Sequence, residues 1–242
     1  MARHFTENGI AFVSINTRGH DTISDFPVAE TTGSFRRIGN AFERFEECVF
    51  DIEAAITFLE KKGHTQITLC GHSLGAVKVT YYLATTKDPR VSRLILMSPP
   101  DMISLAEADD ARAEFVATAN RMIQEGKNEE LLPKQLWDEY YLSATTYLNL
   151  FTRDLPIDVF NTYDKDKSSS LSEIRVPTLA FLGEFDDAVT IPPTRALEII
   201  KSRATSAPRV DTAIVPGADH GYVGKEQEMT ALIVEWLGAY EK

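Results

Sequence analysis

The chain has 242 residues, 43% of them apolar, which is enough to bury the core of one domain with room for an insertion. Its 36 acidic residues outnumber its 25 basic ones and give a formal net charge of −11. Because no dense cluster of Lys or Arg occurs, we expect neither a nucleic acid nor an anionic membrane surface as a partner.

The cysteine content and the absence of targeting patterns predict a cytoplasmic protein. Cys48 lies in an expected helix and Cys70 ends an expected strand, so both are predicted to be small buried residues. Two cysteines do not make a disulfide framework. No stretch is long enough to span a bilayer, and the first residues lack the layout of a signal peptide.

Apolar runs of strand length alternate with helical patterns along the chain. This alternation predicts the α/β class, with a mostly parallel sheet covered by helices on both faces. The expected strands are residues 9–16, 66–70, 91–97, 177–182 and 210–215. The expected helices are the end of one over 1–8, then 40–62, 74–84 and 226–240, the last with Tyr240 on its packing face.

The expected helix over 40–62 has one apolar stripe and one acidic face. Asn40 is placed as its N-cap, and Gly63 follows its end. The apolar stripe consists of Phe42, Phe45, Val49, Ile52, Ile56 and Leu59. The opposite face, expected to be solvated, carries Glu43, Glu47, Glu53 and Glu60.

The stretch over 101–170 interrupts the alternation, because it is rich in helix-forming residues and lacks β-branched runs. We expect it to be a helical cap inserted in a core made of residues 1–100 and 171–242. Trp137, Tyr140, Tyr141, Tyr147, Leu148 and Phe151 recur there at helical spacing, which favours packing of the cap over direct ligand contact.

The pentapeptide Gly71-His72-Ser73-Leu74-Gly75 follows an expected strand and opens an expected helix. That context is typical of a nucleophile elbow, in which a tight turn presents the serine above the sheet. Glycines two residues before and after the serine would remove side chains that collide in this turn. Ser73 is therefore the predicted nucleophile.

A serine nucleophile needs a base. His220 lies in the loop after the last expected strand, at the edge of the sheet where the elbow ends, and is the predicted base. His72 lies inside the elbow and is expected to pack against the site or tune it. His20 follows the first expected strand and is a candidate to face the pocket.

The base in turn needs an acid to orient it, and three aspartates follow strands. Asp186, after the strand over 177–182, is the first choice and Asp187 the second. Asp101, after the strand over 91–97, is a third alternative. The chain order Ser73, Asp186, His220 is the order found in one class of hydrolases.

With these motifs the chain resembles the α/β-hydrolase superfamily over essentially its whole length. The resemblance rests on Asn16-Thr-Arg-Gly-His-Asp21, the elbow, Gly183-Glu-Phe-Asp-Asp187 and Ala218-Asp-His-Gly221. The first of these, with Gly39-Asn-Ala-Phe-Glu-Arg-Phe-Glu46, is similar more narrowly to microbial hydrolases related to fungal siderophore ester hydrolases.

The resemblance also implies three strands before residue 9, and a loop after one of them that donates to the oxyanion hole. The chain shows neither, so only the backbone N–H of Leu74 is assigned to that hole. We favour the interpretation that the chain is a fragment. The alternative is a complete protein that takes its second donor from the cap, a partner chain or the Arg18-Gly19-His20 loop. Such a protein is expected to be weakly active or to form a homodimer through an exposed sheet edge.

The predicted activity is hydrolysis of a small carboxylic ester through an acyl-enzyme. The alternatives are a thioesterase, amidase or acyltransferase on the same triad, or a binding protein without catalysis. Candidate substrate contacts are His72, Arg18, His20, Trp137 and Tyr141. No spacing of metal ligands and no phosphate-binding glycine loop occurs, so no metal and no cofactor are expected.

Overall fold

The computed structural model describes residues 2–28 and 33–239. It divides into two compact units. The first contains Met1–Ile15, Leu59–Asp101 and Val159–Lys242, and the second contains Asn16–Phe58 and Met102–Asp158. The predicted division into a core and a cap over 101–170 remains a prediction.

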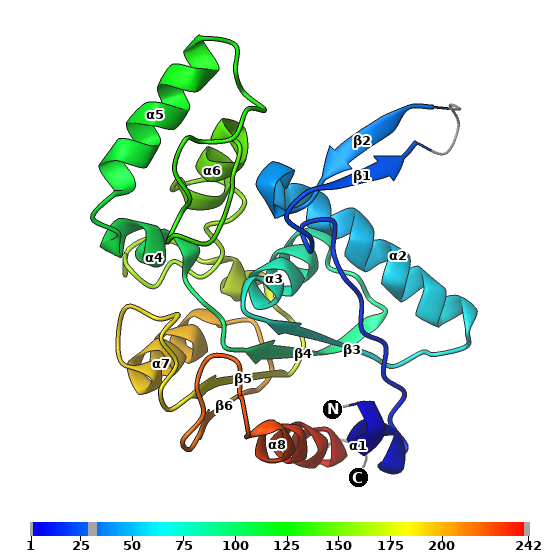
Figure 1. The fold of residues 1–242 in the computed structure, drawn as a ribbon. Helices are drawn as coiled ribbons and strands as arrows, with labels where there is room; N and C mark the ends of the chain where they lie inside the picture. Colours follow the sequence, from blue (N-terminus) through cyan, green and yellow to red (C-terminus); the bar gives the residue numbers. More distant parts are fainter. Residues whose placement is uncertain (1, 29–32, 240–242) are drawn as a thin grey trace. The chain divides into compact units, whose positions relative to one another are not determined.

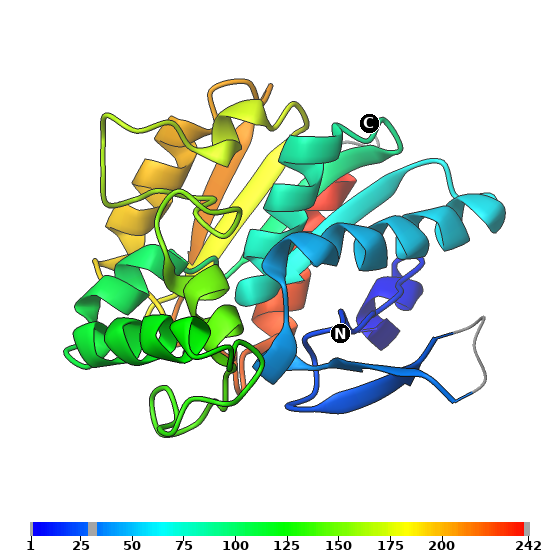
Figure 2. The same cartoon turned by 90° about the horizontal axis from the view of Figure 1, so that it is seen from above.

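The first unit is built on a parallel sheet of four strands. They are β3 (Ile67–His72), β4 (Val91–Met97), β5 (Thr178–Gly183) and β6 (Val210–Val215), hydrogen-bonded in the order β3-β4-β5-β6. Figure 2 shows the strands side by side. The apolar runs over 66–70, 91–97, 177–182 and 210–215 were therefore correctly predicted as strands.

Helices cover both faces of this sheet, as expected (Figure 1). One face carries α3 (Leu74–Thr86), α7 (Pro193–Arg203) and the short 3-10 turn η3 (Ser170–Glu173). The other face packs against α1 (Ala2–Glu7) and α8 (Glu226–Gly238). All six residues of β5 are buried, which explains its unbroken apolar sequence.

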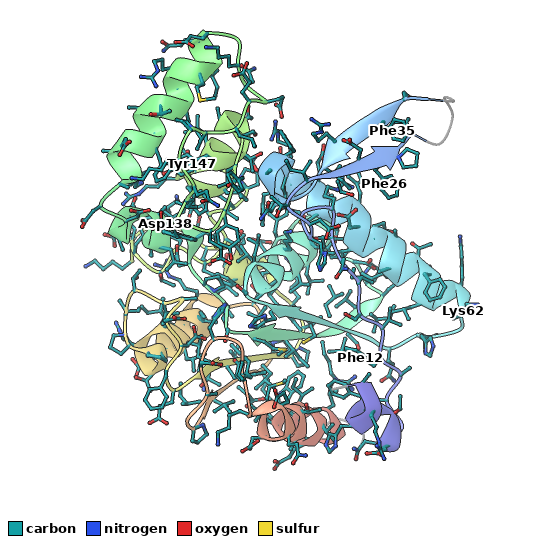
Figure 3. The ribbon with its side chains drawn as sticks, viewed as in Figure 1. Phe12, Phe26, Phe35, Lys62, Asp138 and Tyr147 are labelled. Atoms are coloured by element: carbon teal, nitrogen blue, oxygen red, sulfur yellow. The ribbon has the colours of Figure 1, made fainter. Side chains whose placement is uncertain are left out.

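The core between the sheet and α8 contains side chains from alternate positions along the strands. Ile95 and Met97 of β4 and Leu179 and Phe181 of β5 belong to it, together with Trp236 of α8. At its margin the rings of Phe5 and Phe12 stack with their centroids 5.3 Å apart, beside α1 (Figure 3). The expected helices over 1–8 and 226–240 are confirmed in their described part, while Met1 and Tyr240 lie outside the described residues.

The expectation of a strand over 9–16 was wrong, because these residues form no regular element. Their composition is that of a strand, but a strand also needs a neighbour that takes its backbone hydrogen bonds. Within residues 2–28 and 33–239, no strand pairs with this segment or with the outer edge of β3. The expectation that Cys70 is buried was also wrong, because it lies on this edge strand and is exposed.

The second unit contains a hairpin that the sequence did not predict. Its antiparallel strands are β1 (Ser24–Pro27) and β2 (Phe35–Ile38). Phe26 and Phe35 are 62% and 64% exposed on it (Figure 3). Four-residue strands that contain Asp, Pro and two Arg give no alternation that a sequence pattern could detect.

The helix expected over 40–62 begins later than predicted. Two 3-10 turns, η1 (Asn40–Phe42) and η2 (Phe45–Glu47), precede α2 (Cys48–Lys61). Asn40 is therefore not the N-cap of α2. The apolar stripe of α2 is confirmed at the buried residues Ile52 and Ile56. Gly63 follows the end of α2 and has a φ of +89°.

Glu43 was predicted to be solvated, but it is buried. It precedes α2 and therefore does not lie on the exposed face of that helix. A Cβ on Gly19 would lie 2.2 Å from the Glu43 Oε2 atom. A side chain at position 19 would therefore require the end of the Glu43 side chain to move.

The stretch between β4 and β5 contains three helices, α4 (Met102–Ala108), α5 (Arg112–Gln124) and α6 (Ala144–Phe151). The buried ring of Tyr147 packs against Phe115 and Phe151, with centroids 5.2 and 5.3 Å away (Figure 3). No helix in the described ranges is long and apolar enough to cross a bilayer.

The spacing of Trp137, Tyr140 and Tyr141 in the sequence predicted a helix, but these residues do not lie on one. They lie in an irregular hairpin in which Leu136 pairs with Tyr140. The Glu139 N–H donates to the Leu136 carbonyl at 3.1 Å, and Trp137 and Asp138 both have positive φ, at +53° and +55°. Both angles lie in the left-handed region, which glycine adopts most readily.

Candidate active site

Ser73 lies in the turn between β3 and α3, in a backbone conformation that non-glycine residues rarely adopt. Its φ is +55° and its ψ is −128°, and its N–H donates to the Met97 carbonyl at 3.0 Å. A Cβ on Gly71 would lie 2.3 Å from the Gly75 carbonyl oxygen, so glycine is required at 71. The steric argument is wrong for Gly75, where a Cβ would meet nothing within 4 Å.

His220 hydrogen-bonds to the side chains of Ser73 and Asp186. Its Nε2 lies 2.9 Å from Ser73 Oγ, and its Nδ1 lies 2.9 Å from Asp186 Oδ1. Ser73 follows β3, Asp186 follows β5 and His220 follows β6, so the carboxyl ends of parallel strands bring the three together. The Asp186 side chain is fully buried, and 24% of the His220 side chain is exposed.

Asp186 and His220 each shift the pKa of the other toward the charged form. The hydrogen bond to Asp186 raises the pKa of His220 above its ordinary value, although burial opposes this. Burial alone would raise the pKa of Asp186, but hydrogen bonds from His220 and Ser98 outweigh it and the pKa is lowered. Asp186 is therefore a carboxylate at neutral pH and accepts the Nδ1–H of His220.

His72 lies beside His220, at the end of β3. Its Nε2 donates to the backbone carbonyl of His220 at 2.8 Å, and the two imidazole rings are 5.0 Å apart. Burial lowers the pKa of His72, so it is neutral and its proton is on Nε2. His72 thus attaches the loop that carries His220 to the end of β3.

Sequence reasoning missed two residues behind Asp186, namely Ser98 and Tyr222. Each is 1% exposed, and their hydroxyl groups are hydrogen-bonded at 2.8 Å. Their only signal in the sequence is position, since Ser98 follows β4 and Tyr222 lies two residues after His220. Both have positive φ, at +46° and +56°, which a sequence pattern does not reveal.

The other two candidate acids do not contact His220 by hydrogen bonding. Asp187 is exposed. Asp101 accepts hydrogen bonds from the backbone N–H and the hydroxyl of Thr162, at 2.6 and 2.7 Å. Leu74, the predicted oxyanion donor, is the first residue of α3.

Four predicted substrate contacts, Arg18, His20, Trp137 and Tyr141, belong to the second unit. The Arg18 guanidinium donates to Asp51 and Glu47 at 2.6 to 3.0 Å, so its donors serve ion pairs within that unit. The exposed His20 lies 3.1 Å from Asp21, measured from Nδ1 to Oδ1.

Trp137, Tyr140 and Tyr141 form an exposed aromatic group, with 43%, 36% and 47% of their surfaces accessible. The Trp137 ring meets those of Tyr140 and Phe151 edge to face, with centroids 6.2 and 5.8 Å away. In the part of the chain that the structure describes, no group of three His, Cys, Asp or Glu side chains could hold a metal ion.

A hydrogen-bonded serine, histidine and aspartate at the carboxyl ends of parallel strands are the arrangement that defines the Ser-His-Asp hydrolase class. The family model of the alpha/beta hydrolase fold matches residues 1–153, and the chain therefore belongs to the α/β-hydrolase fold family. A search of curated protein sequences gives no match.

Solved structures share the fold at low sequence identity. The α/β hydrolase GrgF from Penicillium sp. sh18 is 17% identical, with a TM-score of 0.62, over 97% of this chain and 82% of that one. Est1E from Butyrivibrio proteoclasticus is 20% identical, with a TM-score of 0.54, over 81% and 70%. A monoacylglycerol lipase from Paleococcus ferrophilus is 20% identical, with a TM-score of 0.51, over 81% and 75%.

Proposed function

We propose that this protein hydrolyses carboxylic esters, with Ser73 as nucleophile, His220 as general base and Asp186 as the acid that orients it. The observation that carries the proposal is the continuous hydrogen-bonded path from Ser73 Oγ through both ring nitrogens of His220 to Asp186 Oδ1. The strained backbone of Ser73, which holds Oγ toward the base, supports it.

The proposed reaction has two halves. Ser73 Oγ attacks the ester carbonyl while its proton passes to His220 Nε2, and the imidazolium returns that proton to the leaving alcohol. Water then attacks the acyl-enzyme while His220 takes its proton, and the imidazolium passes that proton to Ser73 Oγ as the carboxylic acid leaves. Asp186 stays ionised throughout and stabilises the imidazolium.

The developing oxyanion needs donors, and the backbone N–H of Leu74 is the proposed one. It follows the nucleophile and opens α3, so that the N-terminus of this 13-residue helix adds partial positive charge near it.

The substrate side of the proposal rests on the exposed aromatic group of the second unit. Trp137 is held in a strained turn, and strain of this kind often marks a binding segment. We propose that Trp137 and Tyr141 contact an apolar or aromatic part of the ester. Replacing either by Ala should raise KM for an aromatic ester and leave kcat nearly unchanged, as a loss of uniform binding does.

Labelling with a fluorophosphonate tests the nucleophile. The protein should be labelled at Ser73, and Ser73→Ala should remove both the label and ester hydrolysis, with kcat falling by about 10³-fold or more. Ser92→Ala, which removes a serine of β4 from the same sheet, is the control and should keep both. Labelling that persists in Ser73→Ala would contradict the assignment.

A substrate panel tests the reaction class. It should contain p-nitrophenyl esters of increasing acyl length, a ferulate ester, a hydroxamate ester of the siderophore type, and a matched thioester and anilide. The ferulate ester is included because Est1E has been solved with ferulic acid bound. Preference for the thioester or the anilide over every ester would overturn the proposal of an esterase while retaining the nucleophile.

A further inference from the structure

The loop that carries His220 is attached to the neighbouring loop after β5, which carries the aspartate of the triad. The Phe185 N–H donates to the Ala218 carbonyl at 2.9 Å. The Gly217 N–H donates to the Glu184 carboxylate at 2.8 Å. These two hydrogen bonds involve the backbone of the His220 loop, so they fix its distance from the aspartate and leave its distance from the nucleophile to other contacts.

Toward the nucleophile, the same loop has one attachment besides the hydrogen bond between Ser73 and His220. Among the residues that the structure describes, the His72 side chain provides the only further hydrogen bond from the turn after β3 to this loop. It runs from His72 Nε2 to the His220 carbonyl and is 2.8 Å long. Because a carbonyl only accepts, the proton is on Nε2 of His72 and the direction of the bond is settled.

The position of His72 makes this bond a tether and not a part of the core. His72 is exposed on β3, the edge strand of the sheet. Its ring packs on one side against the rings of His220 and Tyr222, with centroids 5.0 and 6.1 Å away. If the imidazole were lost, water could donate to the carbonyl in its place, so the stability of the fold should change little. Water would not, however, join the carbonyl to the turn of the nucleophile.

We propose that His72 is a positioning residue of the active site: its Nε2–H holds the His220 carbonyl and thereby sets the distance between His220 Nε2 and Ser73 Oγ. That distance is 2.9 Å, within the range for direct proton transfer. A displacement of about 1 Å can slow such a step by as much as about 10²-fold. That the proton transfer serves ester hydrolysis rests on the proposed function, whereas the tether between the two segments does not.

Three substitutions separate the donor of His72 from its ring. His72→Phe keeps an aromatic ring and removes the donor. His72→Gln places an amide N–H at nearly the reach of the imidazole Nε2, whereas the shorter side chain of His72→Asn cannot bring its amide to the carbonyl. His64→Phe is the control, because it makes the same replacement at an exposed histidine that precedes β3 and lies outside the site.

Two kinds of readout follow the tether. The first is kcat and KM for a p-nitrophenyl ester, measured across the pH range. The second is hydrogen exchange of the Tyr222 and Val223 amides, which donate to Asp219 within the His220 loop and need no turnover. Thermal unfolding is measured alongside, so that a loss of activity is separated from a loss of the fold.

We expect His72→Phe and His72→Asn to lower kcat about tenfold with KM unchanged within about twofold, and to speed exchange of both amides. His72→Gln should restore kcat to within about threefold of the unaltered protein and slow the exchange again. The acid limb of the pH profile should not move, because the carboxylates that raise the pKa of His220, namely Asp186, Asp187 and Asp219, are unchanged. His64→Phe should behave as the unaltered protein.

A kcat for His72→Phe within about twofold of the unaltered protein would overturn the positioning role, as would a His72→Gln variant that is as slow as His72→Phe. If His72→Phe does not fold, the comparison of His72→Asn with His72→Gln decides in the same way. If the unaltered protein hydrolyses no ester, only the proposed function fails. Hydrogen exchange then decides on the tether, and equal exchange in all three variants and the unaltered protein would refute it.

Discussion

At the scale of single residues, Asp186 and its neighbour Asp187 form a natural comparison. Asp186 is buried against His220, whereas Asp187 is exposed one position later. We expect Asp186→Asn to lower kcat by roughly 10³- to 10⁴-fold, because an amide cannot accept the Nδ1–H with the same charge and leaves the imidazole in the wrong tautomer. Asp187→Asn should lower it less than about tenfold. Similar losses in both variants of the purified protein would reject Asp186 as the acid.

The pH dependence of activity follows from the direction in which the pKa of His220 is shifted. His220 accepts a proton only when it is neutral, and its pKa is raised above the ordinary value of 6.5 by Asp186. Activity should therefore be complete at alkaline pH and lost as the pH falls through a value above 6.5. A profile of kcat/KM against pH, measured with a substrate that does not titrate, checks this. An acid limb well below 6.5 would show that Asp186 does not support the base in solution.

At the scale of the elements, the hairpin that carries Trp137 is strained in a way that can be relieved. Asp138 lies between the bridge residues Leu136 and Tyr140 at φ +55°, in the left-handed region that favours glycine. We expect Asp138→Gly to stabilise the fold by about 0.5–1 kcal/mol, since glycine adopts this angle without steric cost.

Thermal unfolding checks this, and a rise in Tm of a few degrees is expected for a chain of this length. Asp138→Ala removes the carboxylate but keeps the strain, so it should give no such rise. A lower Tm for Asp138→Gly than for Asp138→Ala would contradict the argument from backbone strain.

The sequence predicted the elements whose signal is local. The four core strands were found because runs such as Val91–Met97 are apolar and bounded by turn residues. Ser73, Asp186 and His220, which the structure joins by hydrogen bonds, could be predicted to lie together because each follows its own strand. The hairpin β1-β2, the late start of α2 and the burial of Glu43 depend on contacts between distant segments, which no periodicity records. Ser98 and Tyr222 were missed for the same reason.

At the scale of the whole molecule, the net charge of −11 governs solubility. The sequence pI is about 5.0, so we expect a minimum of solubility near that pH. The fold should persist there. Burial alone would raise the pKa of Asp88, but hydrogen bonds from Arg90 and Tyr82 lower it to about 2, and the pKa of Glu47 is also lowered.

Carboxyl groups with lowered pKa stabilise the folded state at pH values above their unfolded pKa, near 4, and lose this effect only as the pH falls further. Protein that precipitates at pH 5 should therefore be native and should redissolve at pH 7.5. Turbidity and near-ultraviolet circular dichroism before and after the cycle check this. A lost near-ultraviolet spectrum after redissolving would mean that acid unfolds the chain before its charge is neutralised.

The location of the triad within one unit has a consequence for how such a protein can diverge. The spacing of β3, β5 and β6 is fixed by the hydrogen bonds of a single sheet, and His72 attaches the loop of the base to the turn of the nucleophile. The three side chains of the proposed proton transfer, Ser73, His220 and Asp186, therefore all belong to the first unit. If the proposed function holds, the aromatic hairpin of the second unit is free to change in length or composition without moving any of these three side chains.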